Sequence, residues 1–383
     1  MKKVLIVHNK YQQLGGEDIA VENEIQFLKK YYDVRVIYFE NKITNYFKQT
    51  LYFILNKNIS SARLLKRTLE EFNPDLVYVH NTWFKASVSV FTIIKKSKIP
   101  ILVKLHNFRY DCTKSLFLKR HLNNTNKCLA CGLEIKEKRY INLYFEESIL
   151  KSFLVFLYGR KYFRILRNSE EIKIAVLTEF HKSHLIKSGF SDDRIFVYPN
   201  YIEDKNTKPN LKKKKQIVYA GRISKEKGVE ELITAFLKTS LNDYDLLIIG
   251  SGPHKKLLEK QYQYENIKFL GQLSNNKVKN ILQESTAVVT ATKLYEGQPT
   301  LLCEASLLKV PSIFPDTGGV KEFFPKNTKY IFEQFNYQDL ASKLESLSNL
   351  NEVDIEGKKN YDYLKEKIGI SKIKSNFDEI IQA

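Results

Sequence analysis

The sequence has no long apolar run and only four cysteines, and both features limit the classes of protein to which it can belong. No stretch approaches the ~20 apolar residues that a helix needs to cross a bilayer. The apolar residues 4–7, behind Met1, Lys2 and Lys3, are too few for a secretory signal and suit the first strand of a sheet. We therefore expect a cytoplasmic protein, and structural disulfides are rare in that compartment.

Composition and charge describe a basic globular protein. Hydrophobic residues make up 43% and charged residues 27% of the 383 positions, as in folded proteins, and this length suits two domains. The net charge is +19, and residues 1–200 carry 34 Lys or Arg against 19 Asp or Glu. This excess favours an anionic partner, such as nucleic acid, an acidic membrane face or a phosphorylated substrate. The alternative is a Lys-rich composition without a binding role.

Short apolar runs alternate with helical patterns along the chain. Strands are expected at residues 4–8, 34–39, 75–80, 101–106, 172–177, 195–198, 217–220, 246–249, 267–270, 287–290 and 311–314, and helices at 17–30, 228–238, 277–283 and 299–309. Such runs are typical of parallel strands buried on both faces. The polar, Lys-rich residues 204–216 interrupt the pattern as a linker. The sequence therefore predicts an α/β protein with two Rossmann-like, doubly wound domains facing a cleft.

Residues 139–167 mix aromatic, aliphatic and basic side chains. This mixture favours a basic amphipathic surface that rests on an anionic membrane. The alternative is a pair of helices that pack on their own domain.

The strongest local motif is EGQPTLLCEA at residues 296–305. It follows a predicted strand, so it lies at the carboxyl end of the sheet, where α/β folds bind ligands. Pro299 can occupy the first turn of the helix that carries Glu304, and free N–H groups at a helix start suit a phosphate. Glu296 and Glu304 can accept hydrogen bonds from sugar hydroxyls. Alone, the motif also fits a helix with a solvated glutamate at each end.

A second motif, YAGRISKEKG at residues 219–228, follows the first strand of the second half. Gly221 at the strand end lets the backbone approach a ligand. Arg222 and Lys227 lie in one loop, and two cations suit a diphosphate. An ordinary basic loop is the alternative, and the presence of the acidic motif weakens it.

Together these motifs resemble the retaining GT-B glycosyltransferases of family 4, the glycosyl transferases group 1, of the bacterial surface-polysaccharide type. The resemblance includes GRISKEKG (221–228), GSGP (250–253), EGQPTLLCEA (296–305) and GGVKE (318–322). In the N-terminal half, GGE (15–17), PDLVYVHN (74–81) and YPN (198–200) look like the family's corresponding segments. The order of the pieces over most of the chain makes the set fairly specific.

The resemblance implies a role for each matching residue. Arg222 and Lys227 would hold the donor diphosphate and stabilise the leaving group. Glu296 would contact the donor sugar, and Glu304 would contact the ribose. His106 would face the sugar and help to stabilise the transition state. The other donor-binding residues that the resemblance implies are Gly15, Gly16, Gly221, Gly252, Gly297, Pro299 and Thr300.

The implied activity is transfer of a sugar, in the hexosyltransferase class, from a nucleoside-diphosphate sugar to a glycan or lipid-diphosphate-linked acceptor. No cofactor or metal would be required, because the two cations replace the metal and no Asp-x-Asp motif occurs in a suitable loop. The enzyme would bind no nucleic acid and would work in the cytoplasm, on the inner face of an anionic membrane.

The resemblance also implies a domain plan. Residues 1–202 would bind the acceptor and contain a cysteine-bearing insertion at about 107–165. Residues 203–365 would bind the nucleotide sugar. Residues 366–383 would form a helix that packs back on the first domain.

Other functions remain as rivals. One is a nucleotide-sugar epimerase of the same fold, which needs no acceptor; another is a partner subunit without activity. A basic nucleic-acid-binding protein is a third, although the chain lacks a recognised binding motif. A hydrolase that uses Glu296 and Glu304 is disfavoured because both lie on one loop–helix unit.

Three of the cysteines cluster in the sequence. Cys128 and Cys131 form a C-x₂-C pair, and Cys112 lies sixteen residues upstream. This is part of the spacing of a structural zinc site, which His121 could complete. Free thiols that pack the loop, or a redox pair, are the alternatives.

Overall fold

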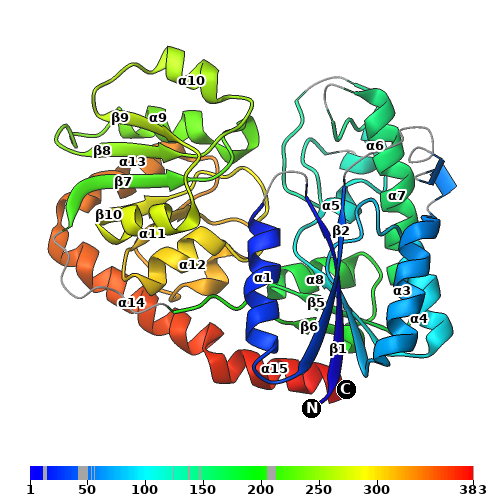
Figure 1. The fold of residues 1–383 in the computed structure, drawn as a ribbon. Coiled ribbons are helices and arrows are strands. Elements are labelled where there is room, and N and C mark those ends of the chain that lie inside the picture. The colour runs from blue at the N-terminus through cyan, green and yellow to red at the C-terminus, as the bar shows by residue number, and fades with distance from the viewer. Residues whose placement is uncertain are drawn as a thin grey trace. The chain divides into compact units, whose positions relative to one another are not determined.

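The computed structural model describes residues 1–11, 15–41, 51–52, 54–55, 57–123, 125–136, 139–145, 148–204 and 213–382. The chain forms two compact units (Figure 1). Unit 1 comprises Met1–Tyr201 with Ile373–Ala383, and unit 2 comprises Ile202–Lys372. Most of the expected linker, residues 205–212, lies outside the described residues. Its last part was predicted wrongly, because residues 214–216 begin a strand.

Unit 1 contains a six-stranded parallel sheet of order β2-β1-β3-β4-β5-β6. The strands are β1 (Lys3–Lys10), β2 (Asp33–Glu40), β3 (Leu76–Val79), β4 (Ile101–Leu105), β5 (Ile172–Val176) and β6 (Ile195–Val197). The main helices are α1 (Gly16–Leu28), α3 (Ile59–Phe72), α4 (Ser89–Ser97), α5 (Arg109–Cys112), α6 (Leu118–Leu122), α7 (Ile149–Asn168) and α8 (Glu179–Lys187). The expected α/β class is confirmed, and the apolar runs form the strands.

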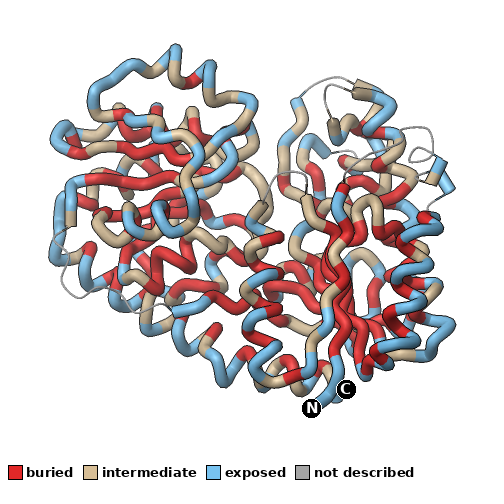
Figure 2. Tube along the Cα trace, in the orientation of Figure 1, coloured by how far each residue is buried: buried red, intermediate tan, exposed pale blue. Residues whose placement is uncertain are grey.

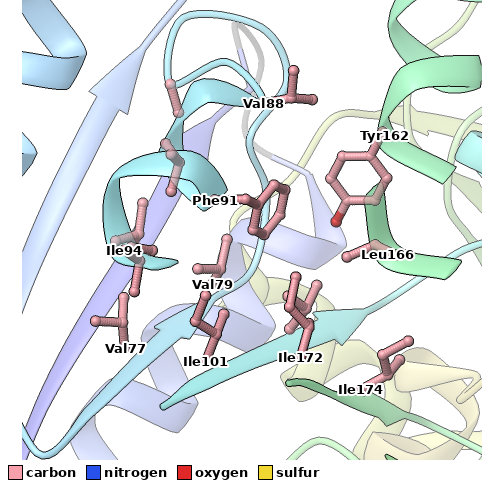
Figure 3. Close-up of a cluster of buried hydrophobic side chains, with 14 of the residues drawn as sticks. Val77, Val79, Val88, Phe91, Ile94, Ile101, Tyr162, Leu166, Ile172 and Ile174 are labelled. Carbon is pink, nitrogen blue, oxygen red and sulfur yellow. The ribbon is translucent and has the colours of Figure 1, made fainter. Parts of the chain in front are cut away.

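One face of this sheet packs on α3, α4, α7 and α8 through a purely apolar layer. Figure 3 shows Phe91 of α4 and Leu166 of α7 beside the strand residues Val79, Ile101 and Ile172. Figure 2 shows the strands as an almost continuous buried band. Strands that are buried on both faces read as uninterrupted apolar runs, which is why the sequence revealed them.

The opposite face of the same sheet holds charge and aromatic groups. Nζ of Lys104 lies 2.9 Å from Oε2 of Glu24, and both side chains are 0% exposed. The hydroxyl of Tyr78 donates to Oε1 of Glu24 at 2.7 Å. The terminal helix α15 (Ile370–Gln382) contributes Phe377, whose ring lies 5.6 Å from that of Tyr78. The C-terminal segment is thus part of the core of unit 1.

Residues 139–167 do not form a pair of helices. Ile149–Asn168 is a single 20-residue helix, α7, and residues 139–145 precede it without helical structure. Helix α7 has a glycine in its middle, Gly159. A Cβ at this position would lie 2.1 Å from the Thr113 hydroxyl oxygen, so a larger residue does not fit there. In the described ranges, no helix has the length and apolar character needed to span a membrane.

Unit 2 contains a second six-stranded parallel sheet, of order β12-β11-β10-β7-β8-β9. The strands are β7 (Lys214–Ala220), β8 (Asp245–Ile249), β9 (Ile267–Gly271), β10 (Ser285–Val289), β11 (Ser312–Pro315) and β12 (Ile331–Phe332). The helices are α9 (Val229–Phe236), α10 (Lys255–Gln261), α11 (Asn275–Gln283), α12 (Thr300–Leu307), α13 (Tyr337–Glu345) and α14 (Leu350–Ile368).

The strand order reverses once in each sheet. In unit 2 the reversal lies between β7 and β10, and in unit 1 it lies between β1 and β3. Open α/β sheets bind ligands at the carboxyl ends of the strands, beside such a reversal. The segments that follow these four strands are therefore the places where each unit can form a site.

Candidate active site

The loop after β7 carries the two expected cations. Arg222 is exposed, and Lys227 ends a short 3₁₀ turn, Lys225–Lys227. Gly228 follows with a φ of 67°, and a Cβ there would lie only 2.0 Å from the carbonyl oxygen of Ala291. Glycine at 228 therefore lets this loop lie directly against the segment that follows β10.

Lys227 forms an ion pair with Glu296, which lies in that segment after β10. The two side chains are 28% and 30% exposed, so both remain open to solvent. The hydroxyl of Thr292 donates to the same carboxylate oxygen of Glu296 at 3.1 Å. The structure thus brings together one member of the expected cationic pair and one member of the expected acidic pair, beside the reversal of strand order in unit 2.

Two further loops close on this position. After β11, the Gly319 amide donates to the carbonyl of Glu296 at 2.8 Å, and a Cβ at Gly318 would lie 2.4 Å from that oxygen. After β8, the amide of Ile223 donates to the carbonyl of Ser251 at 2.9 Å, and a Cβ at Gly252 would lie 2.2 Å from the Ile223 carbonyl oxygen. The glycines of the motifs are therefore required where one backbone approaches another.

Glu304 lies on α12 and is 7% exposed. Its Oε1 accepts from Nζ of Lys279 at 3.1 Å and from Nδ2 of Asn275 at 3.4 Å. Sequence reasoning missed both partners, which come from α11, because no spacing links them to the motif. Pro299 is the N-cap rather than the first helical residue, one position earlier than expected.

The other residues of this motif share its partly open position. Gly297, Pro299 and Thr300 are all half-buried between Glu296 and the first turn of α12. Gly221 is exposed at the end of β7, where its amide donates to the carbonyl of Ile249 at 2.9 Å. The expected donor-binding residues of unit 2 thus gather at the carboxyl ends of β7, β8 and β10.

Unit 1 has a small pocket at its own reversal of strand order. The lining residues follow β1 and β3, end or follow β4, or belong to α1 and α5; they are Tyr11, Glu17, His80, Asn81, Lys104, Leu105, His106, Asn107, Arg109 and Tyr110. His106, expected from the sequence, therefore lies in a pocket. Glu17 accepts from the Tyr11 hydroxyl at 2.8 Å and from Nδ2 of Asn107 at 3.1 Å.

Two histidines among the lining residues contact each other. Nδ1 of His80 and Nε2 of His106 are 3.0 Å apart, and the rings stack. Burial lowers the pKa of both imidazoles well below the usual value, and the nearby Lys104 and His8 lower it further. Both rings are therefore neutral near pH 7, and in a neutral pair one nitrogen donates while the other accepts.

The start of α1 is fixed by side chains rather than by its glycines. Asp18 accepts from Nε2 of His8 at 2.8 Å and from the Gly15 amide at 3.0 Å. A Cβ at Gly16 would meet no described atom within 4 Å, and one at Gly15 would meet only ordinary contacts. Packing among the described residues therefore does not require glycine at either position. The preceding residues 12–14 are outside the described ranges.

Sequence reasoning missed most side chains of the unit 1 pocket. His80 stood within the quoted PDLVYVHN segment but received no role, and Lys104 is the one charge in the apolar run ILVKL. A lone charge in a strand that is buried on both faces needs a buried partner of opposite charge, and this signal could have predicted such a partner, although not that it is Glu24.

The predicted cysteine cluster is also present in unit 1, and none of its cysteines lines the pocket. The sulfurs of Cys112, Cys128 and Cys131 all lie within 4.8 Å of one another. Nε2 of His121 is 3.9 Å from the Cys112 sulfur. All four cysteines of the chain, Cys303 included, are free thiols.

Comparison with known proteins shows which families and structures this chain resembles. The sequence model of glycosyl transferases group 1 matches residues 201–367. TuaC of Bacillus subtilis (strain 168), a glycosyltransferase named for teichuronic acid biosynthesis, is 28% identical over 296 residues. That match covers 76% of this chain but only 65% of TuaC, slightly less than two thirds of its length. The amylovoran biosynthesis glycosyltransferase AmsD of Erwinia amylovora is 23% identical over 356 residues, which cover 91% of this chain and 90% of AmsD.

Solved structures agree with the fold. HepE of Anabaena, crystallised with UDP and glucose, superposes with a TM-score of 0.67 over 100% of both chains at 13% identity. At that identity the likeness concerns the fold alone. The glycosyl transferases group 1 model thus matches somewhat less than half of the chain, and the whole chain has the GT-B fold of these solved structures.

Proposed function

We propose that this chain transfers a sugar, with retention of anomeric configuration, from a nucleoside-diphosphate sugar to a glycan or lipid-diphosphate-linked glycan during surface-polysaccharide assembly. The observation that carries the proposal is the Lys227–Glu296 ion pair beside the reversal of strand order in unit 2. Relatives named for teichuronic acid and amylovoran biosynthesis support a polysaccharide product. HepE, crystallised with UDP and glucose on the same fold, supports a nucleotide-sugar donor.

The cations of unit 2 are proposed to act on the donor diphosphate. Arg222 is exposed and Lys227 pairs with Glu296 at a partly exposed position, so both are accessible to a ligand. When a diphosphate arrives, Lys227 exchanges the Glu296 carboxylate for phosphate oxygens. Its charge then stabilises the negative leaving group as the bond to the sugar breaks. In this proposal the two cations do the work that a divalent metal does in other transferases.

The carboxylates are proposed to recognise the two sugars of the donor. Glu296, released from Lys227, accepts hydrogen bonds from hydroxyls of the transferred sugar. Glu304, already held by Lys279, accepts from the ribose hydroxyls. The free amides at the start of α12, beside Gly297 and Thr300, suit the phosphates.

In unit 1, His106 is proposed to hydrogen-bond the transferred sugar at the transition state. Its pairing with His80 and its low pKa keep the ring neutral, so it donates a hydrogen bond without adding positive charge. Gly15 and Gly16 are proposed to let the backbone approach the distal phosphate, since packing among the described residues leaves room for a side chain at both positions.

Thermal unfolding with a panel of nucleoside diphosphates tests the donor site. One of them, at a concentration of 100 Kd, should stabilise the protein by about 2.7 kcal/mol. Lys227→Ala should abolish the shift, while the matched control Lys225→Ala, an exposed lysine in the same turn, should retain it. If no nucleoside diphosphate raises the melting temperature, the donor site is wrongly assigned.

Product analysis tests the reaction. The purified enzyme with the stabilising nucleotide's sugar should consume donor only when an acceptor glycan is added, and proton NMR of the product should show the donor's anomeric configuration. A new nucleotide sugar formed without acceptor would instead identify an epimerase.

Membrane contact is proposed for a surface formed by Phe117, α6, residues 139–145 and the first turns of α7. Exposed apolar side chains are Phe117 (62%), Tyr140 (91%), Ile149 (64%) and Leu150 (68%). An antiparallel bridge between Phe117 and Ile141 places Phe117 beside Tyr140. Lys119, Arg120 and Lys151 add positive charge, which complements an anionic inner membrane face.

Vesicle sedimentation tests this surface. The protein should sediment with phosphatidylglycerol vesicles and much less with phosphatidylcholine vesicles. The double variant Phe117→Ser/Leu150→Ser should lose most of the binding. A control, Ile355→Ser, removes a comparably exposed apolar side chain from unit 2 and should bind as the unchanged protein does. Equal binding by both variants would contradict the assignment.

A further inference from the structure

Unit 1 contains a compact group of sulfur and nitrogen ligands that the transfer reaction does not use. Cys112 ends the short helix α5, His121 lies in α6, and Cys128 and Cys131 flank a tight turn. The three sulfurs all lie within 4.8 Å of one another, and Nε2 of His121 lies 3.9 Å from the sulfur of Cys112.

These separations match a tetrahedral metal site. Zinc binds thiolate sulfur at about 2.3 Å and imidazole nitrogen at about 2.0–2.1 Å, so two ligands of one ion stand roughly 3.6–3.8 Å apart. The distance from Cys112 to His121 is close to that value. If the three sulfurs move slightly closer together around one ion, the sulfur–sulfur distances also reach this range. Cys₃His is an established ligand set for structural zinc, with C-x₂-C as its usual spacing.

The turn between Cys128 and Cys131 has the backbone that such a site needs. The amide of Cys131 points at the sulfur of Cys128, 3.4 Å away, and the amide of Gly132 donates to the carbonyl of Cys128 at 2.8 Å. Gly132 has a φ of 75°, a region that favours glycine. An N–H directed at a sulfur stabilises the thiolate form, which is the form that binds metal.

The surrounding chain has little else to hold it. Between α5 and α7 the described secondary structure is the five-residue helix α6 and two isolated bridges, Phe117–Ile141 and Lys127–Glu134. Segments with so little core commonly depend on a metal for their fold. The lysines and arginine nearby, at positions 119, 120 and 127, offset the charge of three thiolates.

We propose that Cys112, Cys128, Cys131 and His121 bind one structural Zn²⁺ ion. The ion joins the end of α5 to α6 and to the Cys128–Cys131 turn. It is structural because four protein ligands fill the tetrahedron and leave no open position for a substrate. The inference does not depend on the proposed donor or acceptor, so its failure and that of the proposed function are separate results.

Metal analysis of the purified full chain is the first test. Protein purified without added chelator should contain one zinc per chain, released by a thiol-modifying reagent. Replacement of the zinc by Co²⁺ should produce the intense visible bands of tetrahedral cobalt together with a sulfur-to-cobalt charge-transfer band. A zinc-free protein that gives no such bands would overturn the proposal, and so would loss of two thiols to a disulfide on handling in air.

Variants assign the ligands. His121→Ala keeps all three sulfurs and should fold, yet weaken zinc binding by at least ~100-fold, because even outer partners of a ligand contribute 10–100-fold. Cys128→Ser should lose the metal. Two matched controls, Cys303→Ala and His254→Ala, change the same residue types in unit 2 and should retain one zinc per chain. Full zinc content and an unchanged cobalt spectrum in His121→Ala would remove His121 from the site, and full zinc content in Cys128→Ser would overturn the site itself.

Discussion

The two units form their candidate sites at the same topological position but from different kinds of residue. In unit 2, glycines let the loops after β7, β8, β10 and β11 lie against one another, while Lys227 and Glu296 stay about 30% exposed. In unit 1, several polar groups at or beside the site are buried: His80 is 2% exposed, and the Lys104–Glu24 pair is 0% exposed. Burial makes the cost of an unpaired charge large. Substitutions should therefore affect mainly stability in unit 1 and mainly activity in unit 2.

The largest stability effect is expected at the buried pair of unit 1. Lys104→Met leaves the Glu24 carboxylate buried without its cation and should lower the free energy of unfolding by about 3–5 kcal/mol. Urea unfolding followed by fluorescence reports on this unit, because the chain's single tryptophan, Trp83, lies in it.

A double variant tests whether the loss arises from the unpaired charge. Lys104→Met/Glu24→Gln removes both charges and keeps an acceptor for the Tyr78 hydroxyl, so it should recover most of the stability. Loss of less than about 1 kcal/mol in the single variant would contradict the contrast drawn between the units.

The largest effect on activity is expected at Lys227. Lys227→Ala should slow sugar transfer by about 10²–10³-fold at saturating donor, because in the proposed reaction it removes the positive charge that stabilises the leaving diphosphate. The free energy of unfolding should change by no more than about 1 kcal/mol, as is usual for partly exposed ion pairs. Steady-state kinetics and urea unfolding on the same preparation measure both, with Lys225→Ala as the control. A slow and strongly destabilised variant would show that Lys227 is structural.

A pair of glycines isolates the role of close backbone approach in unit 2. Gly228 and Gly271 have nearly the same φ, 67° and 68°, but a Cβ at Gly228 would lie 2.0 Å from a carbonyl oxygen and one at Gly271 meets no described atom within 4 Å. Gly271→Ala should lower the free energy of unfolding only by the cost of the left-handed backbone conformation, about 1–2 kcal/mol. Gly228→Ala should lower it more, and should also weaken binding of the stabilising nucleotide. Thermal and urea unfolding give the comparison; equal losses would mean that the loop moves aside without cost.

The sequence revealed the fold and the unit 2 site better than the unit 1 site, for a physical reason. Doubly buried strands are apolar runs, and loops that must touch need glycine at fixed positions, so β7, Gly228 and Gly318 leave a local signature. Contacts such as Lys104–Glu24, 80 residues apart, arise only when α1 covers β4. Spacing along the chain does not encode them.

The same reason explains the individual errors. The mixed residues 139–167 showed amphipathic composition but not where the helix begins, because Ser148 sets that start by accepting from the amide of Lys151. Lys279 and Asn275 were missed because α11 meets Glu304 only through the packing of α11 on α12. Residues 214–216 were predicted as linker because they are charged, but they form the exposed start of β7. There Lys214 pairs with Glu284 and Lys215 pairs with Asp243.

The smallest expected effect concerns acid, and it sharpens the same contrast because six of the seven histidines lie in unit 1. Burial lowers the pKa of His181 to about 3, with a further contribution from His184, while Asp111 opposes the shift. Between that value and the ordinary value near 6.5, the unfolded chain binds a proton at this ring and the folded chain does not. The contribution of this residue to the free energy of unfolding is therefore full above pH 6.5 and falls as the pH drops, by about 1.4 kcal/mol per pH unit.

His181→Phe should reduce the pH slope by that amount in urea unfolding followed through Trp83 between pH 7 and pH 5. An unaltered slope in His181→Phe would show that the folded protein accepts the proton at this position. It would also contradict the burial of His181 that its ring contact with Phe108, at 4.3 Å between centroids, indicates.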